Sequence, residues 1–260
     1  MRPRYFSKHL ARALIGALSG TALAAGLAFG TAAAPEAERL GDIDHIYDIY
    51  LGGLWVAEMT VTAEIANDHY EADAVLRTKG LIGALYKASF EVEAEGAVAA
   101  ETGYYPARFT ANSRNSKKSQ FVEMRYEAGR PSTLTAEPEF QPKPWEVDPT
   151  AQADAADPLS AALGVLANQP AESLCNRKVE IFDGRKRYAI VLGEPEERAD
   201  GIKCPATYQR LAGYKPKFMA KPDIPFAFWF EAGPNGSYHV QKAMGETPVG
   251  TAVIRRRPAE

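Results

Sequence analysis

The chain has 260 residues, with 30 basic and 33 acidic side chains and a formal net charge of −3 at pH 7. A general nucleic-acid-binding protein carries a basic surface field, so this balance argues against nucleic acid as a partner. The length suffices for one large β domain with a substantial core, or for two small domains.

The first 33 residues carry the three parts of a secretory signal. A start with four cations and no acid precedes an apolar stretch over 13–30, and small residues follow at 31–34. We expect cleavage after Ala32 or Ala33, which leaves 26 basic and 33 acidic side chains and a net charge of −7. The sequence therefore predicts a signal peptide at 1–33, a single β-rich domain at 34–260 and a periplasmic location.

A retained membrane anchor is the alternative reading of this segment, because 13–30 is close to the shortest length that spans a bilayer. No later stretch is apolar enough to span a membrane. We therefore expect no membrane span once the signal is removed.

Period-two alternation of apolar and polar residues dominates the exported part. It runs over 55–65, 70–76 and 88–94, and three consecutive strands with one apolar and one polar face indicate an antiparallel sheet. Further strands are predicted at 104–112, 119–127, 132–137, 178–182, 185–192, 203–210, 225–231, 237–243 and 249–256.

One helix is well signalled, with Asp157 as the N-cap and Pro158 at the first helical position. The proline-rich stretch 138–158 before it is interpreted as a crossover within one domain. A single short helix cannot cover so much one-sided sheet, so the sheet must bury its apolar face against itself. The predicted fold class is all-β and mainly antiparallel, a long curved sheet that forms a half-barrel, open barrel or β-spiral with one short helix.

The only two cysteines, Cys175 and Cys204, lie in the exported part and are predicted to form a disulfide. If the strands around them form a meander, one strand separates them, and two strand spacings exceed the reach of a disulfide. Cys175 should therefore lie in the loop before its strand, at the hairpin end opposite Asp183-Gly184. That dipeptide is typical of a two-residue primed turn.

Motifs of catalysis and cofactor binding are absent: there is no nucleophile elbow, zinc-protease motif, phosphate-binding loop or dinucleotide fingerprint. Two thiols alone cannot build a closed zinc site. His45, His69 and His239 are far apart in the sequence. We predict no catalytic residue, no metal and no cofactor, and therefore no enzyme; a hydrolase remains open, because histidines and carboxylates distant in sequence can converge in space.

Two apolar stretches break the alternation. Residues 80–86 are a glycine-punctuated apolar connection, and 225–230 is apolar on both faces, which requires cover on both sides. Helix or sheet provides that cover, or a bound hydrophobic ligand does. The candidate ligand-binding residues are Leu81, Leu85, Tyr86, Phe226, Phe228 and Trp229, with Arg185 and Arg187 as partners of an anionic head group. The alternative for the two arginines is ion pairing with neighbours such as Glu180.

The segments IYDIYLGGLWVAEMTVTAE, LRTKGLIGALYKASFEVEAEG, YYPARF, DPLSAAL, VEIFDGRKRY and PFAFWFEAGPNGSYHVQKAMGETPVGTAVI occur in this order along the exported chain. In this set and order the chain resembles the bacterial exported proteins grouped as domain of unknown function 3108. The resemblance implies an exported, mostly β protein with a curved antiparallel sheet, similar to the half-barrels of lipoprotein carriers and to spiral envelope proteins. It implies no activity and no catalytic residues.

Two functional hypotheses follow. In the first, a soluble periplasmic β-protein binds a lipid or other apolar or amphipathic envelope molecule inside its curved sheet. In the second, a non-catalytic envelope scaffold with a dry core acts through protein partners on its surface.

Overall fold

The computed structural model describes residues 42–66, 68–99, 103–233 and 236–258. The predicted signal peptide and its cleavage site lie outside these ranges. The described residues form one open sheet of 14 antiparallel strands with few helices, which confirms the predicted all-β class.

The strands fall into two groups of seven along the chain, and the segment that contains the longest helix joins the two groups. The first group comprises β1 (Ile43–Leu51), β2 (Leu54–Ile65), β3 (His69–Thr78), β4 (Ala88–Ala99), β5 (Gly103–Asn115), β6 (Ser119–Glu127) and β7 (Arg130–Glu137). The second comprises β8 (Arg177–Phe182), β9 (Arg187–Leu192), β10 (Glu196–Arg198), β11 (Gly201–Ala212), β12 (Ile224–Ala232), β13 (Tyr238–Thr247) and β14 (Gly250–Arg256). The helices are α1 (Gly80–Leu85), α2 (Pro158–Leu166) and α3 (Pro216–Met219), with short 3₁₀ turns at Pro149–Ala151 and Ala171–Ser173.

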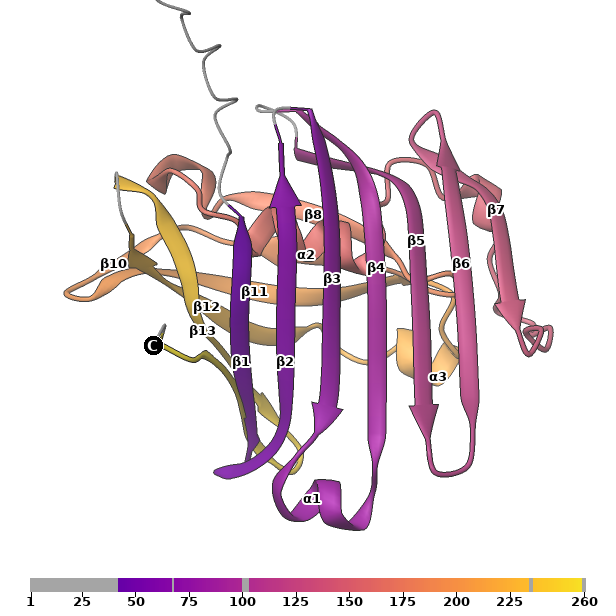
Figure 1. Ribbon diagram of the computed structural model, residues 1–260, viewed down its shortest axis with the longest axis horizontal. Helices are drawn as coiled ribbons and strands as arrows, with labels where there is room; N and C mark the ends of the chain where they lie inside the picture. The colour runs from indigo at the N-terminus through magenta and orange to yellow at the C-terminus, as the bar shows by residue number, and fades with distance from the viewer. Residues whose placement is uncertain (1–41, 67, 100–102, 234–235, 259–260) are drawn as a thin grey trace, which may run out of the picture. The chain divides into compact units, whose positions relative to one another are not determined.

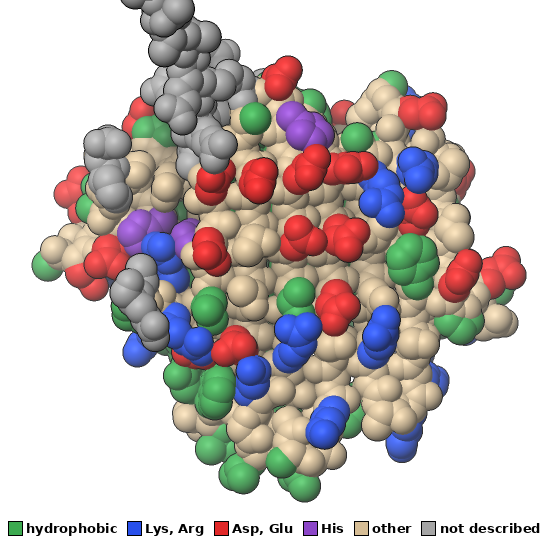
Figure 2. All heavy atoms as spheres, viewed as in Figure 1, with side chains coloured by type: hydrophobic (Ala, Val, Ile, Leu, Met, Phe, Trp, Pro, Cys, Tyr) green, Lys and Arg blue, Asp and Glu red, His purple; other side chains and the backbone are tan. Residues whose placement is uncertain are grey.

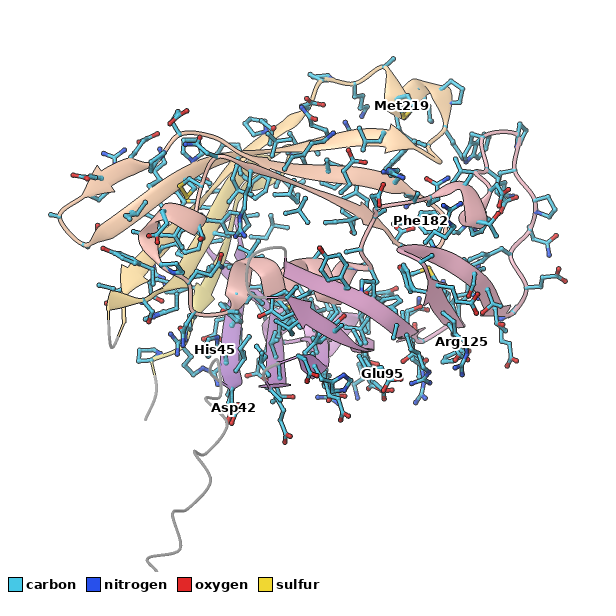
Figure 3. The ribbon with its side chains drawn as sticks, turned by 90° about the horizontal axis from the view of Figure 1, so that it is seen from above. Asp42, His45, Glu95, Arg125, Phe182 and Met219 are labelled. Atoms are coloured by element: carbon cyan, nitrogen blue, oxygen red, sulfur yellow. A yellow bond between two sulfur atoms is a disulfide. The ribbon has the colours of Figure 1, made fainter. Side chains whose placement is uncertain are left out.

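The two groups join through the first and last strands. The order along the sheet is β7-β6-β5-β4-β3-β2-β1-β14-β13-β12-β11-β9-β8, with β10 paired to β11. β1 and β14 therefore lie side by side in the middle, and β7 and β8 are the two ends. Figures 1 and 3 show the sheet curving so that β8, β9, β11 and β12 cross behind β1–β6, with α2 between the two parts.

Helix α2 fills the space inside this curve. Asp157 caps it by accepting hydrogen bonds from the backbone N–H groups of Leu159 and Ser160, both at 2.9 Å. The helix contacts β3, β4, β5, β8 and β13, and Leu163 on it is fully buried. The sheet thus buries its apolar face partly on itself and partly on this helix, as the short predicted helix requires.

The two ends of the sheet do not pair with each other; the chain between them joins them. The N–H of Asp154 donates to Gly129 O at the β6–β7 turn (2.9 Å). On the other side Ala156 pairs with β8: its N–H donates to Glu180 O (3.0 Å), and Phe182 N–H donates to Ala156 O (2.9 Å). We call this junction the seam.

Cys175 and Cys204 form the predicted disulfide, with a Cα–Cα distance of 5.6 Å. Cys175 precedes β8 and Cys204 lies in β11, with β9 between the two strands. The turn at the other end of the hairpin lies one residue further along the chain than predicted. Asp183 N–H donates to Lys186 O at 3.1 Å, so Gly184 and Arg185 form the tip. The Asp183 carboxylate accepts from the backbone N–H groups of Arg185 (2.9 Å) and Lys186 (2.8 Å) and stabilises this turn.

In the described part of the chain, every helix is too short or too polar to cross a bilayer.

Candidate functional site

The residues predicted to line a ligand site lie in three separate places. Leu81, Leu85 and Tyr86 are exposed on and beside α1. α1 connects β3 to β4 at one end of the sheet (Figure 1). These three side chains therefore do not face the interior of the curve.

The aromatic residues of β12 divide between its two faces. Phe226 and Phe228 are half-buried, contact each other edge to face at 5.3 Å between ring centroids and pack against the core. Trp229 faces the other way, where Lys242 Nζ lies 4.3 Å from its ring centroid. The strand is covered on both faces, largely by the protein's own side chains.

Arg185 and Arg187 do not act together. Arg187 donates from Nε to Glu180 Oε2 at 2.7 Å and from Nη1 to Ala153 O at 3.0 Å, so it holds the seam. Arg185 stacks on Phe140, 4.5 Å from the ring centroid. It lines a surface cleft of about 570 Å³ whose other residues are Lys143, Trp145, Lys186, Tyr208, Arg210, Gly213, Tyr214, Lys215, Phe218 and Ile224.

Two of the three histidines converge on the sheet. His45 on β1 and His239 on β13 both lie near Arg256, and His45 Nδ1 is 3.3 Å from the Tyr47 hydroxyl. Burial, followed by the charge of Arg256, lowers the pKa of His45 to about 4. Burial and the charge of Arg256 also lower the pKa of His239, so both imidazoles are neutral near pH 7. The described residues do not include three His, Cys, Asp or Glu side chains grouped to hold a metal ion.

A larger cavity, of about 890 Å³, lies beside α2 at the seam, and we call it the seam pocket. One wall is the small-residue face of α2, with Ala161 and Gly164, and the facing wall is the start of β5, with Tyr104. The segment from Cys175 to Glu180, which includes the start of β8, and the β6–β7 turn form further walls. The chain at 154–156 and the segment after α2 also line the pocket, and they bring the carboxylates of Asp154 and Glu172 to it. A Cβ added at Gly164 would meet only Tyr104, at 3.9 Å, so the absence of a side chain there keeps this part of the pocket open.

Two polar groups of the seam pocket lack partners among the described residues. Nε and Nη2 of Arg177 on β8 are buried without a hydrogen bond, and so is the hydroxyl of Tyr126 on β6. Burial lowers the pKa of Arg177 and raises that of Tyr126. A buried, unpaired donor costs about 1–3 kcal/mol, and more when it is charged. Buried donors without a protein partner can take an acceptor from outside the chain, such as water or a ligand.

The adjoining polar groups, in contrast, form a complete chain of hydrogen bonds. Ser160 Oγ donates to Asp157 Oδ2, and the Tyr70 hydroxyl lies 2.5 Å from Ser160 Oγ. Burial raises the pKa of the Asp157 carboxyl to about 6. This network fixes the start of α2, and through it the wall of the seam pocket.

The arrangement combines an apolar wall, phenol rings and an unpaired guanidinium, which suits an amphipathic ligand with an acceptor or anionic group. Sequence reasoning did not identify Arg177 or Tyr126. One signal was available: Arg177 falls on the same face of its strand as Val179 and Ile181. A cation on the apolar face of a strand is a candidate buried charge.

Comparison with known proteins adds family and fold. A search of curated proteins finds no match. Among solved structures, one similar chain is the crystal structure of a beta-barrel-like protein of domain of unknown function DUF1849 from Brucella abortus. It has 11% sequence identity and a TM-score of 0.47, and the match covers 84% of this chain and 97% of that one. Residues 46–255 match the family described as "Protein of unknown function (DUF3108)". The chain therefore belongs to the DUF3108 family, as the set and order of its sequence segments predicted.

Proposed function

We propose that the protein binds an amphipathic molecule with an anionic group in the seam pocket, and that it does so outside the cytoplasm. The signal-like N-terminus and the disulfide between Cys175 and Cys204 support the location. This hypothesis keeps the expected class of ligand but moves the site from the predicted residues to α2, β5, β6 and β8.

The observation that carries the proposal is the unpaired Arg177 guanidinium at the wall of a cavity. A carboxylate or phosphate that accepts from Arg177 and from the Tyr126 hydroxyl satisfies both groups at once. Binding requires the Arg177 side chain to turn its buried Nε and Nη2 groups toward the cavity. The apolar part of the ligand then lies along Ala161, Gly164 and Tyr104.

Three probes of equal chain length test the role of the anionic group: dodecanoate, dodecyl phosphate and dodecanol. The protein is purified from cells without detergent, and binding is measured by native mass spectrometry and by calorimetry. We expect the two anions to bind at least about tenfold more tightly than dodecanol, because hydrogen bonds to a charged group contribute about 1.5–3 kcal/mol. Equal affinity for the three probes, or no binding, contradicts the proposal.

Two substitutions test whether the probes bind in the seam pocket. Arg177→Met removes the charge while keeping an unbranched chain that fills most of the same space, and it should remove the preference for anions. Gly164→Leu projects a side chain into the cavity and should block all three probes without loss of stability, since leucine also favours a helix. Arg114→Gln, at an exposed position near the end of β5 remote from Tyr104, is the matched control and should leave binding unchanged.

A further inference from the structure

An exposed apolar surface lies at the end of the sheet where α1 is located. Its most exposed members are Leu85 at 87%, Leu81 at 74%, Val249 at 70% and Leu54 at 58%. With Ile82 and Tyr86 they form a set that we call the apolar tip. Large apolar side chains exposed together indicate an interaction surface, whereas single ones do not.

These residues come from three connections between strands: α1, the β1–β2 turn and the β13–β14 turn. Two contacts hold the three together. α1 lies against the start of β2, since a Cβ on Gly80 would be 2.5 Å from Trp55 O. The β1–β2 turn touches the β13–β14 turn, where Gly52 N–H donates to Thr251 O at 2.9 Å. The apolar tip is thus built from loops that are far apart in the sequence and held by glycine contacts.

The charges around the apolar tip have one dominant sign. Lys87 follows α1, and the β5–β6 turn carries Arg114, Lys117 and Lys118 beside it, because Ala88 pairs with Asn115. These four cations are exposed, and no ion pair is found for them within the described ranges.

Two of the nearby carboxylates are paired with cations, and a third, Glu246 beside the β13–β14 turn, is exposed and accepts a hydrogen bond from Thr251 Oγ1 at 2.9 Å. Glu58 pairs with Lys79 at 2.9 Å, and Glu91 pairs with Arg77 at 3.5 Å. Figure 2 shows hydrophobic and basic side chains at the lower end, and acidic ones over the upper and central strands. The end that carries the apolar tip is therefore locally basic on a protein whose net charge is negative.

We infer that the apolar tip docks on the surface of a bilayer that contains anionic phospholipid. Leucine and valine side chains on loops enter the boundary between head groups and acyl chains, and the surrounding lysines and arginine contact phosphate groups. The apolar surface and the unpaired cations are both explained by this one occupant, whereas a neutral apolar partner leaves the cations without a counterpart.

Docking at the apolar tip leaves the seam pocket open to solvent. β4 begins beside α1 and ends at Val98 and Ala99, which line the seam pocket. A strand of this length separates the two places by roughly 35 Å. The inference is therefore independent of the proposed ligand, and each can fail without the other.

The test uses the chain as purified from the producing cell, with its N-terminus established by intact mass. Trp55 adjoins the apolar tip. A Trp145→Phe/Trp229→Phe variant leaves Trp55 as the single tryptophan of the chain, so tryptophan fluorescence then reports on this position. Vesicles of phosphatidylglycerol and phosphatidylethanolamine with brominated acyl chains should quench it. Vesicles of phosphatidylcholine should bind less, and added salt should weaken binding to the anionic vesicles.

Leu81→Ser/Leu85→Ser should lower vesicle partition at least about tenfold, because both side chains lose apolar area that enters the lipid. Phe218→Ser/Met219→Ser removes two exposed apolar residues on α3, away from the apolar tip, and should bind as the wild type does. Lys117→Gln/Lys118→Gln should weaken binding to anionic vesicles only. All variants should keep the thermal unfolding midpoint of the wild type.

Several outcomes overturn the inference. One is the absence of binding to any vesicle, and another is binding that the leucine substitutions leave unchanged, as an uncleaved N-terminal segment would give. A third is self-association, seen by sedimentation, that the leucine substitutions abolish, because a second copy would then cover the apolar tip.

Discussion

Asp157 is a buried helix cap whose charge the fold opposes. Burial raises its pKa to about 6 from the ordinary 3.8. The folded protein therefore holds this proton more tightly than the unfolded chain does. The stability that protonation contributes is fully present below about pH 4 and is lost as the pH rises through 6.

Asp157→Asn should remove this pH dependence. The amide oxygen still accepts from Leu159 and Ser160, so the cap is kept, while the cost of a buried charge disappears. Relative to wild type, the variant should gain up to about 3 kcal/mol in free energy of unfolding between pH 4 and pH 7.5. Urea unfolding across that range measures the difference. Curves that run parallel at all pH values would show that Asp157 does not titrate in this window.

The comparison must be made as a difference between variant and wild type, because His45 acts in the opposite direction. Burial lowers its pKa to about 4 from 6.5. The unfolded chain therefore binds this proton more tightly, and stability falls as the pH drops from about 6.5 to 4. Both proteins contain His45, so its effect cancels in the difference.

The sequence identified single residues where local chemistry decides their role. Asp157 and Pro158 predict a helix start from local chemistry alone. The aspartate carboxylate can cap backbone N–H groups, and the proline ring fixes a backbone angle that suits the first helical position. Arg177 and Tyr126 become unpaired only because α2 and the seam enclose them, and this depends on contacts between distant segments. Arg187 pairs with Glu180 across the β8–β9 hairpin, which their short spacing in the sequence allows, whereas its bond to Ala153 O depends on the seam.

Among elements, the strands with strict alternation were predicted well. β6 occupies the predicted range 119–127, and β2, β3, β5 and β12 differ by a few residues. β1 was missed because its buried face includes His45 and Tyr47, whose polar atoms hide the alternation. α1 was interpreted as an apolar connection, since two glycines within six residues resemble a loop.

The disulfide connects two elements that the sheet keeps apart. Its cysteines are 29 positions apart in sequence, and closing such a loop is worth about 3–4 kcal/mol. Cys175→Ala/Cys204→Ala should lower the free energy of unfolding by that amount, measured by urea titration. It should also loosen Arg177, two residues beyond Cys175, and weaken dodecanoate binding. With reductant present during unfolding, wild type and variant should converge; a gap that persists would point to lost packing instead.

At the scale of the whole molecule, the curvature of the sheet could be predicted from the sequence. The strands have a larger apolar face than one short helix can cover, so the sheet must curve to bury it. The sequence did not show how the ends of the sheet meet. They meet through the backbone of 154–156, and backbone hydrogen bonds leave no pattern of residue types.

The seam therefore gives a test of how the open sheet is held. Ala156→Pro removes the N–H that donates to Glu180 O and should cost about 1–3 kcal/mol. Hydrogen exchange should rise in β8 and in 149–157 while β2–β4 stay protected. Ala156→Gly keeps the N–H and is the control, with a smaller effect. Equal exchange in the two variants would mean that side-chain packing, rather than this backbone pairing, holds the seam.

The adjacency of β1 and β14 has a consequence for how the molecule is made. Synthesis supplies β1 among the first segments of the sheet and β14 last, yet each is the other's neighbour. Until the final residues emerge, a growing chain displays an unfilled edge along β1, which is ready to accept a strand from another molecule. A chain of this design gains by staying unfolded until it is complete, and the export that we propose for it would impose that delay, since the chain would cross the membrane as an extended polymer.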